Sequence, residues 1–417
     1  MKTHSYSTLL KAAGVGILFT VTFAFLSSCG STPKTESPAA NFKAFQIRKI
    51  TGSGLQTVSI KPQSSDWPQL SFQNSTQGST STSTSKTSGS AEKFKMNASQ
   101  LRLAVIGDTG CRLKESKGKY SYQNCLDGQD WIFPQLVQSV VKENYDFLIH
   151  TGDYHYREHC TREECPSVTK SSGYGWAAWW DDFYGPSQDL FKKSPVLLVR
   201  GNHEDCERAY VGWAPLSAHQ QDFTSECRDI EEYQWIEMQD LVFISFDNSS
   251  LSGSGKIKDK HRQKWLPLLK QVTERIQKEA QGKEVWLLTH VPAFAFVPDE
   301  KLAEPVEASD RFAVLAKEAG LLNKVDYILS GHVHSQQIVP RKQLPLQIVV
   351  GNSGTVLDAF GRIINNHRVI TTTETRSSYG YGVFEREGFK KWKLHFKDKD
   401  GEKVLTCEME QQRVFCE

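Results

Sequence analysis

The chain has 417 residues, of which 38% are hydrophobic and 24% are charged, with 50 lysine and arginine residues against 48 aspartate and glutamate residues. This length is ample for one α/β domain with a substantial core and appendages. The nearly balanced charge excludes the strongly basic footprint of a nucleic-acid-binding protein, so we expect no nucleic-acid partner.

The start of the chain has the pattern of an export signal. Lys2 and Lys11 precede an apolar run over residues 12–25 that is too short for a membrane span. The run is followed at 26–29 by Leu-Ser-Ser-Cys, which resembles a bacterial lipobox. Residues 1–28 are therefore predicted to be a lipoprotein signal peptide, with Cys29 as the lipid-bearing first residue of the mature protein. An ordinary secretory signal is the alternative.

Lipid on Cys29 would anchor the protein, since several acyl chains on one residue give stable membrane attachment. Residue 30 is glycine and not the aspartate associated with inner-membrane retention. We therefore expect a place in the bacterial cell envelope, at the outer membrane or in the periplasm rather than at the inner membrane. Cleavage before Cys29 removes two lysines and no acid, so 48 basic residues would face 48 acidic ones.

Residues 29–99 are predicted to be a low-complexity tether. Serine, threonine, glutamine and lysine dominate this segment, which includes an alternating Ser/Thr tract at 79–85. Such a composition cannot bury enough apolar surface to order itself. Within the segment, residues 43–60 alternate between apolar and polar, so a hairpin or two short strands are expected there.

Five short blocks of metal-ligand side chains each follow an apolar run. The runs, at 103–106, 147–149, 196–199, 285–288 and 327–329, are short and unbroken, as buried strands that end in turns are. The blocks are Gly107-Asp108-Thr109-Gly110, Gly152-Asp153-Tyr154-His155-Tyr156, Gly201-Asn202-His203-Glu204, Thr289-His290 and Gly331-His332-Val333-His334. Because ligands bind at the carboxyl ends of strands in open α/β sheets, we expect the five blocks to converge on one crevice.

Helical spacing appears at three places in the part of the chain that contains the five blocks. A stripe of apolar residues between the first two strands predicts a strand–helix–strand unit in a parallel or mixed sheet: Phe133, Leu136, Val137, Val140 and Val141. Aromatic residues over 176–184 share one helical face, which favours a core helix over an aromatic platform for a sugar or base. Residues 259–280 predict a long polar helix that Pro267 kinks or delays.

Eight cysteines remain beside Cys29, and an even number in an exported chain predicts disulfides. Nearest-neighbour pairing is the simplest arrangement: Cys111 with Cys125, Cys160 with Cys165, Cys206 with Cys227, and Cys407 with Cys416. Three of these pairs directly follow a metal-ligand block and would staple its loop, each contributing up to ~3 kcal/mol in the chain-entropy model. A cysteine zinc site is disfavoured, because no pair of Cys-x-x-Cys spacings exists.

The five blocks, in this order, resemble the calcineurin-like metallophosphoesterase superfamily over roughly residues 101–365. The resemblance implies an α/β fold in which a β-sandwich of mixed sheets is flanked by helices. We accordingly expect a metallophosphoesterase domain at 100–365 and a C-terminal β extension at 366–417, a meander closed by the last disulfide. Tyr156, three residues after Asp153, together with Asp-x-Gly in the first block, resembles the purple acid phosphatase branch.

The resemblance implies two metal ions about 3.5–4 Å apart, which clamp the attacking and leaving oxygens of an in-line displacement. One metal would take Asp108, Asp153, Tyr156 and His334, and the other would take Asp153, Asn202, His290 and His332. Oxygen and imidazole ligands suit iron, manganese or zinc. A metal would supply hydroxide as the nucleophile, and His203 would act as general acid towards the leaving alkoxide.

Three further residues near the blocks have weaker interpretations. His150 directly follows an apolar run and is expected to be a neutral, hydrogen-bonded histidine. His155 is expected to touch either substrate or solvent. Arg200 would orient a phosphate or serve as a structural ion-pair partner, and the structural role is preferred.

The sequence thus predicts an exported, membrane-anchored, metal-dependent phosphoester hydrolase, with a phosphomonoester or phosphodiester as substrate. One alternative is a phosphoprotein phosphatase, which residues 198–204 resemble. The first block lacks the Asp-x-His and the second lacks the Asp-Arg-Gly usual in that branch. The other alternative is a non-catalytic surface-binding lipoprotein, since a fold alone does not establish a function.

Overall fold

The computed structural model describes residues 42–63, 67–75, 98–116, 119–219, 221–253, 257–298, 306–307, 311–358, 369–371 and 378–417. The chain divides into two units, residues 1–36 and 37–417, and all described residues belong to the second. The predicted signal peptide, Cys29 and the Ser/Thr tract at 79–85 lie outside the described residues. None of the helices in the described ranges is long and apolar enough to cross a membrane.

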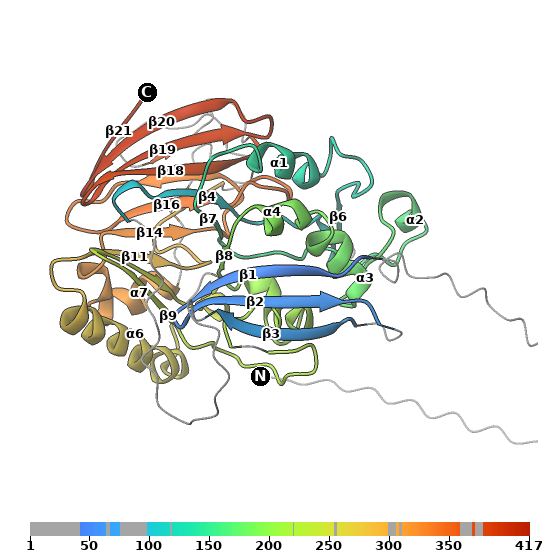
Figure 1. The fold of residues 1–417 in the computed structure, drawn as a ribbon, viewed down its shortest axis with the longest axis horizontal. Helices are drawn as coiled ribbons and strands as arrows, with labels where there is room; N and C mark the ends of the chain where they lie inside the picture. Colours follow the sequence, from blue (N-terminus) through green and yellow to red (C-terminus); the bar gives the residue numbers. More distant parts are fainter. Residues whose placement is uncertain are drawn as a thin grey trace, which may run out of the picture. The chain divides into compact units, whose positions relative to one another are not determined.

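Two sheets form the centre of the second unit (Figure 1). The larger has ten strands in the order β21 (Arg413–Cys416), β20 (Lys403–Glu410), β19 (Lys391–Asp398), β18 (Gly380–Gly388), β4 (Arg102–Ile106), β7 (Phe147–His150), β8 (Val196–Leu198), β1 (Phe45–Thr51), β2 (Gly54–Lys61) and β3 (Gln69–Ser75). The smaller has seven in the order β17 (Ile370–Thr371), β15 (Gln336–Val339), β16 (Leu346–Val350), β14 (Tyr327–Ser330), β11 (Glu284–Leu288), β10 (Leu241–Ser245) and β9 (Gln234–Met238).

Helices cover the outer face of each sheet. The larger sheet packs against α1 (Phe133–Val140), α3 (Trp176–Trp179), the π-helical turn at Trp180–Tyr184, and α4 (Gln188–Lys193). The smaller sheet packs against α6 (Asp259–Glu279) and α7 (Arg311–Glu318), seen at the lower left of Figure 1. The order of layers is therefore helix, sheet, sheet, helix, which confirms the predicted fold class of mixed sheets flanked by helices.

Shorter elements lie in the connections. They are the hairpin of β5 (Leu113–Ser116) and β6 (Lys119–Tyr122), the hairpin of β12 (Phe296–Val297) and β13 (Val306–Glu307), α2 (Cys165–Val168), α5 (Tyr210–Trp213), and single 3-10 turns at Ala98–Gln100, Asn202–Glu204, Ser249–Leu251 and Leu321–Asn323. The β5–β6 hairpin begins a few residues after Asp108, and the turn at Asn202–Glu204 contains the predicted ligand Asn202.

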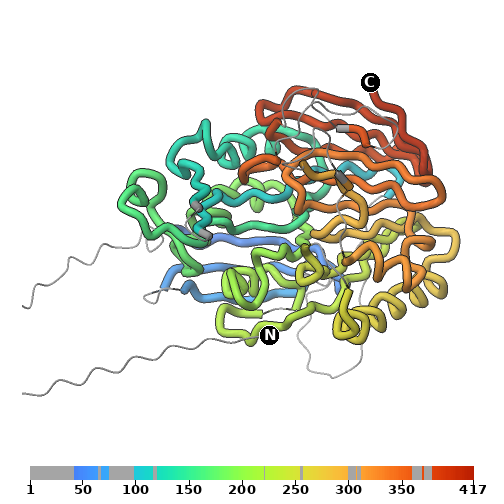
Figure 2. Tube along the Cα trace, turned by 180° about the vertical axis from the view of Figure 1, so that it is seen from behind, coloured from blue at the N-terminus to red at the C-terminus, as the bar shows by residue number. Residues whose placement is uncertain are grey.

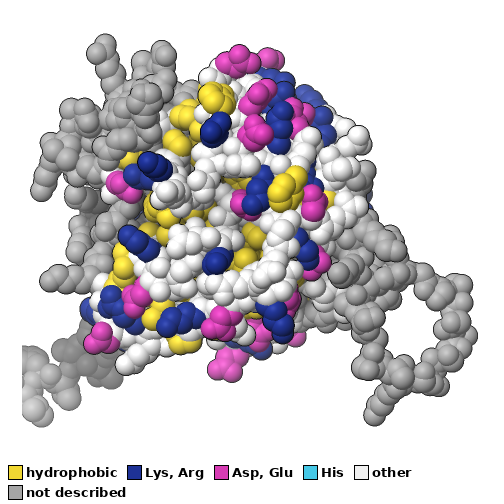
Figure 3. Space-filling view, turned by 90° about the vertical axis from the view of Figure 1, so that its left-hand side faces the viewer, with side chains coloured by type: hydrophobic (Ala, Val, Ile, Leu, Met, Phe, Trp, Pro, Cys, Tyr) yellow, Lys and Arg dark blue, Asp and Glu magenta, His cyan; other side chains and the backbone are white. Residues whose placement is uncertain are grey.

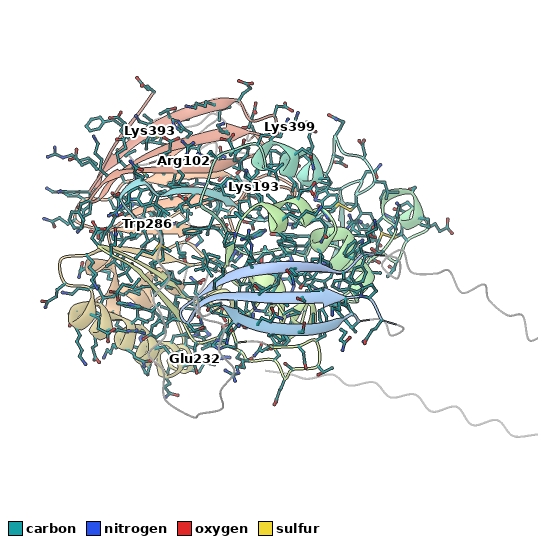
Figure 4. The ribbon with its side chains drawn as sticks, viewed as in Figure 1. Arg102, Lys193, Glu232, Trp286, Lys393 and Lys399 are labelled. Atoms are coloured by element: carbon teal, nitrogen blue, oxygen red, sulfur yellow. A yellow bond between two sulfur atoms is a disulfide. The ribbon has the colours of Figure 1, made fainter. Side chains whose placement is uncertain are left out.

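The alternation of side chains along each strand divides the core into layers. On β4, Leu103 and Val105 face the space between the two sheets, whereas Ala104 and Ile106 face the helices. Trp286 of β11, labelled in Figure 4, lies between the sheets with its ring centroid 5.1 Å from that of Trp392 on β19. The sandwich therefore holds its two sheets together by apolar packing, and the loops at its end are supported from both sides.

The two ends of the described chain occupy opposite edges of the larger sheet, as the blue and red strands of Figure 2 show. The hairpin predicted within 43–60 is present as β1 and β2, and it is extended by β3, which the sequence did not predict. β1 meets β8 in parallel at Lys49 and Val196. The C-terminal meander is confirmed, and β18 joins it to β4 by antiparallel pairing of Gly382 with Val105.

The predicted helices are also confirmed. The apolar stripe of α1 is buried, and α6 continues through Pro267. Trp176, Trp179 and Phe183 are buried against the larger sheet, as expected of core residues. On the face shown in Figure 3, lysine and arginine side chains are interspersed with aspartate and glutamate, so no single sign of charge dominates there.

Candidate metal centre

Five parallel strand ends deliver the predicted ligands to one place. β4, β7 and β8 run parallel in the larger sheet, and β11 and β14 run parallel in the smaller one. Their following loops carry Asp108, Asp153 with Tyr156, Asn202 with His203, His290, and His332 with His334. The structure brings all eight of these side chains together between the carboxyl ends of the two sheets.

One group of side chains surrounds the phenol of Tyr156. Its hydroxyl oxygen lies 3.1 Å from Asp108 Oδ1, 2.8 Å from Asp153 Oδ2 and 3.0 Å from His334 Nε2. His334 Nε2 is in turn 3.6 Å from Asp108 Oδ1. These four residues are the ones predicted to hold the first metal.

A second group surrounds His290. Its Nε2 lies 3.0 Å from Asn202 Oδ1 and 3.2 Å from Asp153 Oδ2. The ligand atoms of Asp153, His290 and His332 all lie within 4.8 Å of one another. Asp153 belongs to both groups, because the same carboxylate oxygen faces Tyr156 and His290. Asp153 thus lies between the two groups, where a bridging ligand was predicted.

Three of these residues have left-handed backbone conformations, with φ of 55° at Asp108, 57° at Asp153 and 70° at His332. Such conformations cost a side-chain-bearing residue on the order of 1–2 kcal/mol and persist where surrounding contacts enforce them. Backbone hydrogen bonds supply that enforcement: Asp108 N donates to Gly152 O at 3.0 Å, and Thr109 N donates to Asp153 O at 3.0 Å. The first two loops therefore hold each other in place.

Glycines next to the ligands allow this close approach. Gly152 has a φ of +106°, and a Cβ there would lie 2.5 Å from His290 Nδ1. A Cβ on Gly331 would lie 2.5 Å from Asp108 Oδ2. Side chains at either position would push ligands of the two sheets apart, which gives a packing reason for the glycines before Asp153 and His332.

Burial and neighbouring charges strongly shift the pKa values of the group. Burial raises the pKa of Asp108 well above its usual range. Burial acts in the same direction on Asp153, but His290 and His203 outweigh it and hold that pKa well below its usual range. Burial would lower the pKa of His290, yet Asp153 raises it to about 9. The carboxylate in the middle therefore stays ionised, as a bridging ligand must.

His203 stands at the edge of this cluster with its two ring nitrogens in different surroundings. Nε2 lies 3.8 Å from Asp153 Oδ2, and Nδ1 lies 3.0 Å from Glu158 Oε1. Arg208 donates to Glu158 Oε1 through Nε at 2.7 Å, and its Nη2 is 2.6 Å from His203 Nδ1. Burial would raise the pKa of Glu158, but contacts with His203 and Arg208 lower it to about 2. An ionised carboxylate thus lies next to Nδ1 of the His203 imidazole.

A family model for calcineurin-like phosphoesterases matches residues 101–336. The chain belongs to the calcineurin-like phosphoesterase family. The family consists of metal-dependent phosphoester hydrolases, so the predicted enzyme class and family are confirmed, and a phosphate ester is the class of substrate. No curated protein sequence matches the chain.

Solved structures similar to this phosphoesterase include three phosphatases or their relatives. They are a purple acid phosphatase from yellow lupin, Lupinus luteus (14% identity, 84% of this chain and 58% of that chain, TM-score 0.47), PhoD (12% identity, 87% and 77%, TM-score 0.50), and a dimetal phosphatase from Danio rerio (11% identity, 75% and 99%, TM-score 0.42). The chain thus spans 58% of the length of the lupin enzyme. At these identities the likeness shows the fold alone.

The donor set of this phosphoesterase fits divalent or trivalent cations. Carboxylate, amide, phenol and imidazole donors converge, and the eight other cysteines whose thiolates would favour softer metals are all in disulfides. Two imidazoles are oriented by backbone carbonyls, with His290 Nδ1 2.9 Å from Thr151 O and His334 Nδ1 2.7 Å from Val356 O. Each therefore presents Nε2 to the cluster, as metal-ligating histidines do.

The disulfides in the phosphoesterase are the predicted nearest-neighbour pairs: Cys111–Cys125, Cys160–Cys165, Cys206–Cys227 and Cys407–Cys416. The first follows Asp108 and the second follows Tyr156, while the third begins three residues after His203. These three bridges lie in the segments that shortly follow the oxygen-donor residues, as expected.

Two buried carboxylates that sequence reasoning missed hold these loops together. Glu204 accepts hydrogen bonds from the backbone N–H groups of Gly201, Asp153, Tyr154 and His155 at 2.9–3.2 Å. Asp182 accepts from the N–H groups of Cys111 and Tyr156, both at 2.7 Å. Glu204 is the last residue of the third block, so its position in the sequence gave a reason to consider it. Asp182 lies among the aromatic residues of 176–184, and nothing in the neighbouring sequence pointed to its role.

The three weaker interpretations are resolved by burial. His150 is buried, 3.0 Å from Thr109 Oγ1, and burial lowers its pKa well below the usual value, as expected of a neutral histidine. Arg200 is buried and pairs with Asp247 at 3.2 Å, which confirms the structural role. The prediction for His155 is wrong: it is fully buried, 2.8 Å from Gly173 O through Nε2 and stacked on Trp179, so it reaches neither solvent nor substrate.

Proposed function

We propose that this protein is a dinuclear-metal phosphomonoesterase or phosphodiesterase in which His203 is the general acid. The observation that carries the proposal is the pair of ligand groups that share Asp153, with His203 beside them and an ionised Glu158 behind it. Asp108, Asp153, Tyr156 and His334 would hold one cation, and Asp153, Asn202, His290 and His332 the other. When bound, the cations would activate water as the nucleophile and neutralise the phosphoryl oxygens.

The metals are proposed to be iron, zinc or manganese, as in a purple acid phosphatase-like centre. Burial and the carboxylates of Asp153 and Asp108 raise the pKa of Tyr156 well above its usual range. A cation must therefore displace the phenolic proton, which ferric iron does more readily than a divalent metal because of its higher charge. A coloured iron–tyrosinate centre would support this branch.

His203 has the geometry of a proton donor. Its Nδ1 faces Glu158, so Nε2 is left to face the reacting groups. Burial lowers the pKa of His203, while the carboxylates of Asp153 and Glu158 act in the opposite direction. Glu158 therefore stabilises the protonated imidazole that gives its proton to the leaving alkoxide. Glu158 is a positioning residue, since it touches His203 and not the substrate.

The protein is further proposed to be exported and lipid-anchored in the bacterial cell envelope through Cys29. The disulfides between the eight other cysteines support an oxidising compartment. Radiolabelled palmitate should enter the full-length protein and not its Cys29→Ala variant. Equal labelling of both would refute the anchor.

The catalytic proposal is tested with His203→Ala and Glu158→Gln, using p-nitrophenyl phosphate and bis-p-nitrophenyl phosphate together with metal analysis. We expect about two metals in the wild type and in both variants. The value of kcat should fall roughly 10²–10⁴-fold in His203→Ala, the usual contribution of a general acid, with a small change in KM.

In Glu158→Gln, loss of the carboxylate lowers the pKa of His203. A general acid works only while protonated, so the alkaline limb of the kcat profile should move to lower pH. If metal-loaded wild-type protein hydrolyses neither ester, the proposed function is refuted. If kcat is unchanged in His203→Ala, His203 is not the general acid.

A further inference from the structure

The strand that follows the first metal-ligand block places two cations at the edge of the metal centre. In β5, Leu113 is buried while its neighbours Arg112 and Lys114 lie on the outward side, because alternate residues of a strand point in opposite directions. Arg112 is half-buried and Lys114 is exposed. The hairpin begins next to the ligands, because Leu113 N donates a hydrogen bond to the backbone oxygen of Tyr156 at 2.9 Å.

The backbone at Arg112 is firmly held. Arg112 N donates to Gln123 Oε1 at 2.8 Å, and Gln123 N donates to Arg112 O at 2.9 Å. On either side, Leu113 N donates to Tyr156 O at 2.9 Å, and Cys111 is bonded to Cys125. The position of this arginine is therefore fixed relative to Tyr156 rather than left to a free loop.

The guanidinium of Arg112 reaches over the metal centre. Its Cζ lies 6.0 Å from the centroid of the Tyr156 ring, and its positive charge contributes to lowering the pKa of His334, for which burial is the main cause. Within the described part of the chain, this side chain has neither a carboxylate partner nor a hydrogen bond. An arginine in this setting presents its planar donors to whatever enters the site.

Lys114 adds a second charge to the same place. Burial lowers the pKa of Lys114 and the positive charge of Arg112 lowers it further, while the carboxylate of Glu158 acts in the opposite direction. Arg208 is neutralised by its ion pair with Glu158. Lys114, like Arg112, has no ion-pair partner among the residues that the structure describes. Arg112 and Lys114 thus put two positive charges on the same side of the segment that follows Asp108, with Arg112 beside Tyr156.

Most lysine and arginine side chains at a protein surface are stabilised by water and need no bound partner. This explanation is sufficient for an isolated, exposed side chain. It does not account for a half-buried arginine whose backbone is fixed beside Tyr156 and whose guanidinium has no carboxylate or hydrogen-bond partner among the described residues. The metal ligands and the metals that they would hold serve the reacting phosphoryl group. Arg112 lies beside Tyr156, one of these residues, and is therefore placed to contact a neighbouring group of a bound substrate.

We propose that Arg112 and Lys114 form an anion subsite that binds a second phosphate group of the substrate, next to the phosphoester that reacts. The inference rests on the proposed function, because it names the class of substrate for the same site. Guanidinium and ammonium groups bind a phosphate by charge-assisted hydrogen bonds, bidentate in the case of arginine. The preferred substrates are therefore bisphosphates or esters of diphosphate rather than simple monophosphates.

The test measures binding to the full-length, metal-loaded protein by calorimetry, with two hydrolysis-resistant probes. Methylenediphosphonate carries two phosphonate groups, and methylphosphonate carries one. We expect Arg112→Gln/Lys114→Gln to weaken binding of the two-group probe at least tenfold, the loss of one or more charge-assisted contacts, and that of the one-group probe less than about threefold. Lys114→Gln alone, at an exposed position, should show part of the effect.

The matched control is Lys342→Gln/Arg413→Gln, which removes the same two charges from exposed positions that line a groove before β14, at the opposite end of that strand from His332. It should bind both probes as the wild type does. Equal weakening of both probes, an unchanged affinity in the Arg112/Lys114 variants, or failure of the wild type to distinguish the probes would overturn the subsite.

Hydrolysis of p-nitrophenyl phosphate by the same preparations separates the two proposals. Selective binding of the two-group probe without any hydrolysis would refute the proposed function and leave the subsite standing. Hydrolysis with unchanged probe affinities in the variants would refute the subsite and leave the function standing.

Discussion

The two sheets contribute different chemistry to the metal centre. The loops of the larger sheet supply oxygen donors, Asp108, Asp153, Tyr156 and Asn202, and those of the smaller sheet supply imidazoles, His290, His332 and His334. Neither sheet alone presents a complete set for either proposed cation. The centre is therefore a product of sheet-to-sheet packing, and the apolar layer around Trp286 and Trp392 is part of what positions it.

The two halves are also held by different means. The oxygen-donor loops are tied by buried carboxylates, by mutual backbone hydrogen bonds and by three disulfides. Two of the imidazoles are oriented instead by single ring contacts to backbone carbonyls. The difference does not come from the distance to the strand end, since Asp108 follows β4 by two residues just as His290 follows β11 and His332 follows β14.

The largest expected effect comes from the residue shared by both groups. Asp153→Asn keeps the shape and tolerates the left-handed backbone, since asparagine adopts that conformation readily. Loss of the bridging charge should remove both metals and lower kcat/KM on the order of 10³-fold or more. Metal analysis and p-nitrophenyl phosphate turnover measure the two effects. Asp189→Asn, at a surface ion pair of α4, is the control and should match the wild type.

A smaller effect is expected on the imidazole side. His290→Asn removes a ligand from only one group, so it should reduce the metal content from about two to about one and lower kcat/KM on the order of 10²-fold. The same metal and turnover measurements apply. Loss of both metals would show that the two groups cannot be occupied independently, and the division into separate sites would then have to be abandoned.

The smallest effects are expected when single disulfides are removed. They compare Cys206–Cys227, which lies near the oxygen-donor loops, with Cys407–Cys416 at the edge of the larger sheet. Cys206→Ser/Cys227→Ser and Cys407→Ser/Cys416→Ser each open one loop and should each cost ~3 kcal/mol of unfolding free energy. Only the first should also lower kcat/KM, because Cys227 Sγ lies 3.5 Å from Arg200 Nη2 and the bridge closes the loop behind His203. Denaturant unfolding and kinetics measure both. A matching loss of activity in the second variant would contradict this division of roles.

The blocks at the ends of apolar runs could be predicted from sequence because each is a local pattern. A run such as 103–106 followed by Gly107-Asp108 predicts a strand and the turn at its end within a few residues. Five occurrences of this pattern leave few folds that are compatible with the sequence. The disulfides belong to the same class, since each joins cysteines that are near neighbours in sequence.

The misjudged residues lay where the answer came from distant parts of the chain. His155 appeared available to substrate because it stands between ligands Asp153 and Tyr156. It is buried by Trp179 and Gly173, which the chain reaches only after the intervening loop. β3 was missed for a related reason: its short polar strand is stabilised by pairing with β2, and its own composition gives little indication of a strand.

By itself, the sequence determined which candidate ligand side chains follow the strands and in which order, and it predicted which cysteines pair, because periodicity and motif spacing are properties of short segments. Tertiary structure alone decided that Glu158 and Arg208 would lie against His203 and that Arg112 would lie beside Tyr156. These contacts depend on how the two sheets pack and on where the long loops lie against them. The packing energy that decides both is a sum over residues far apart in the chain.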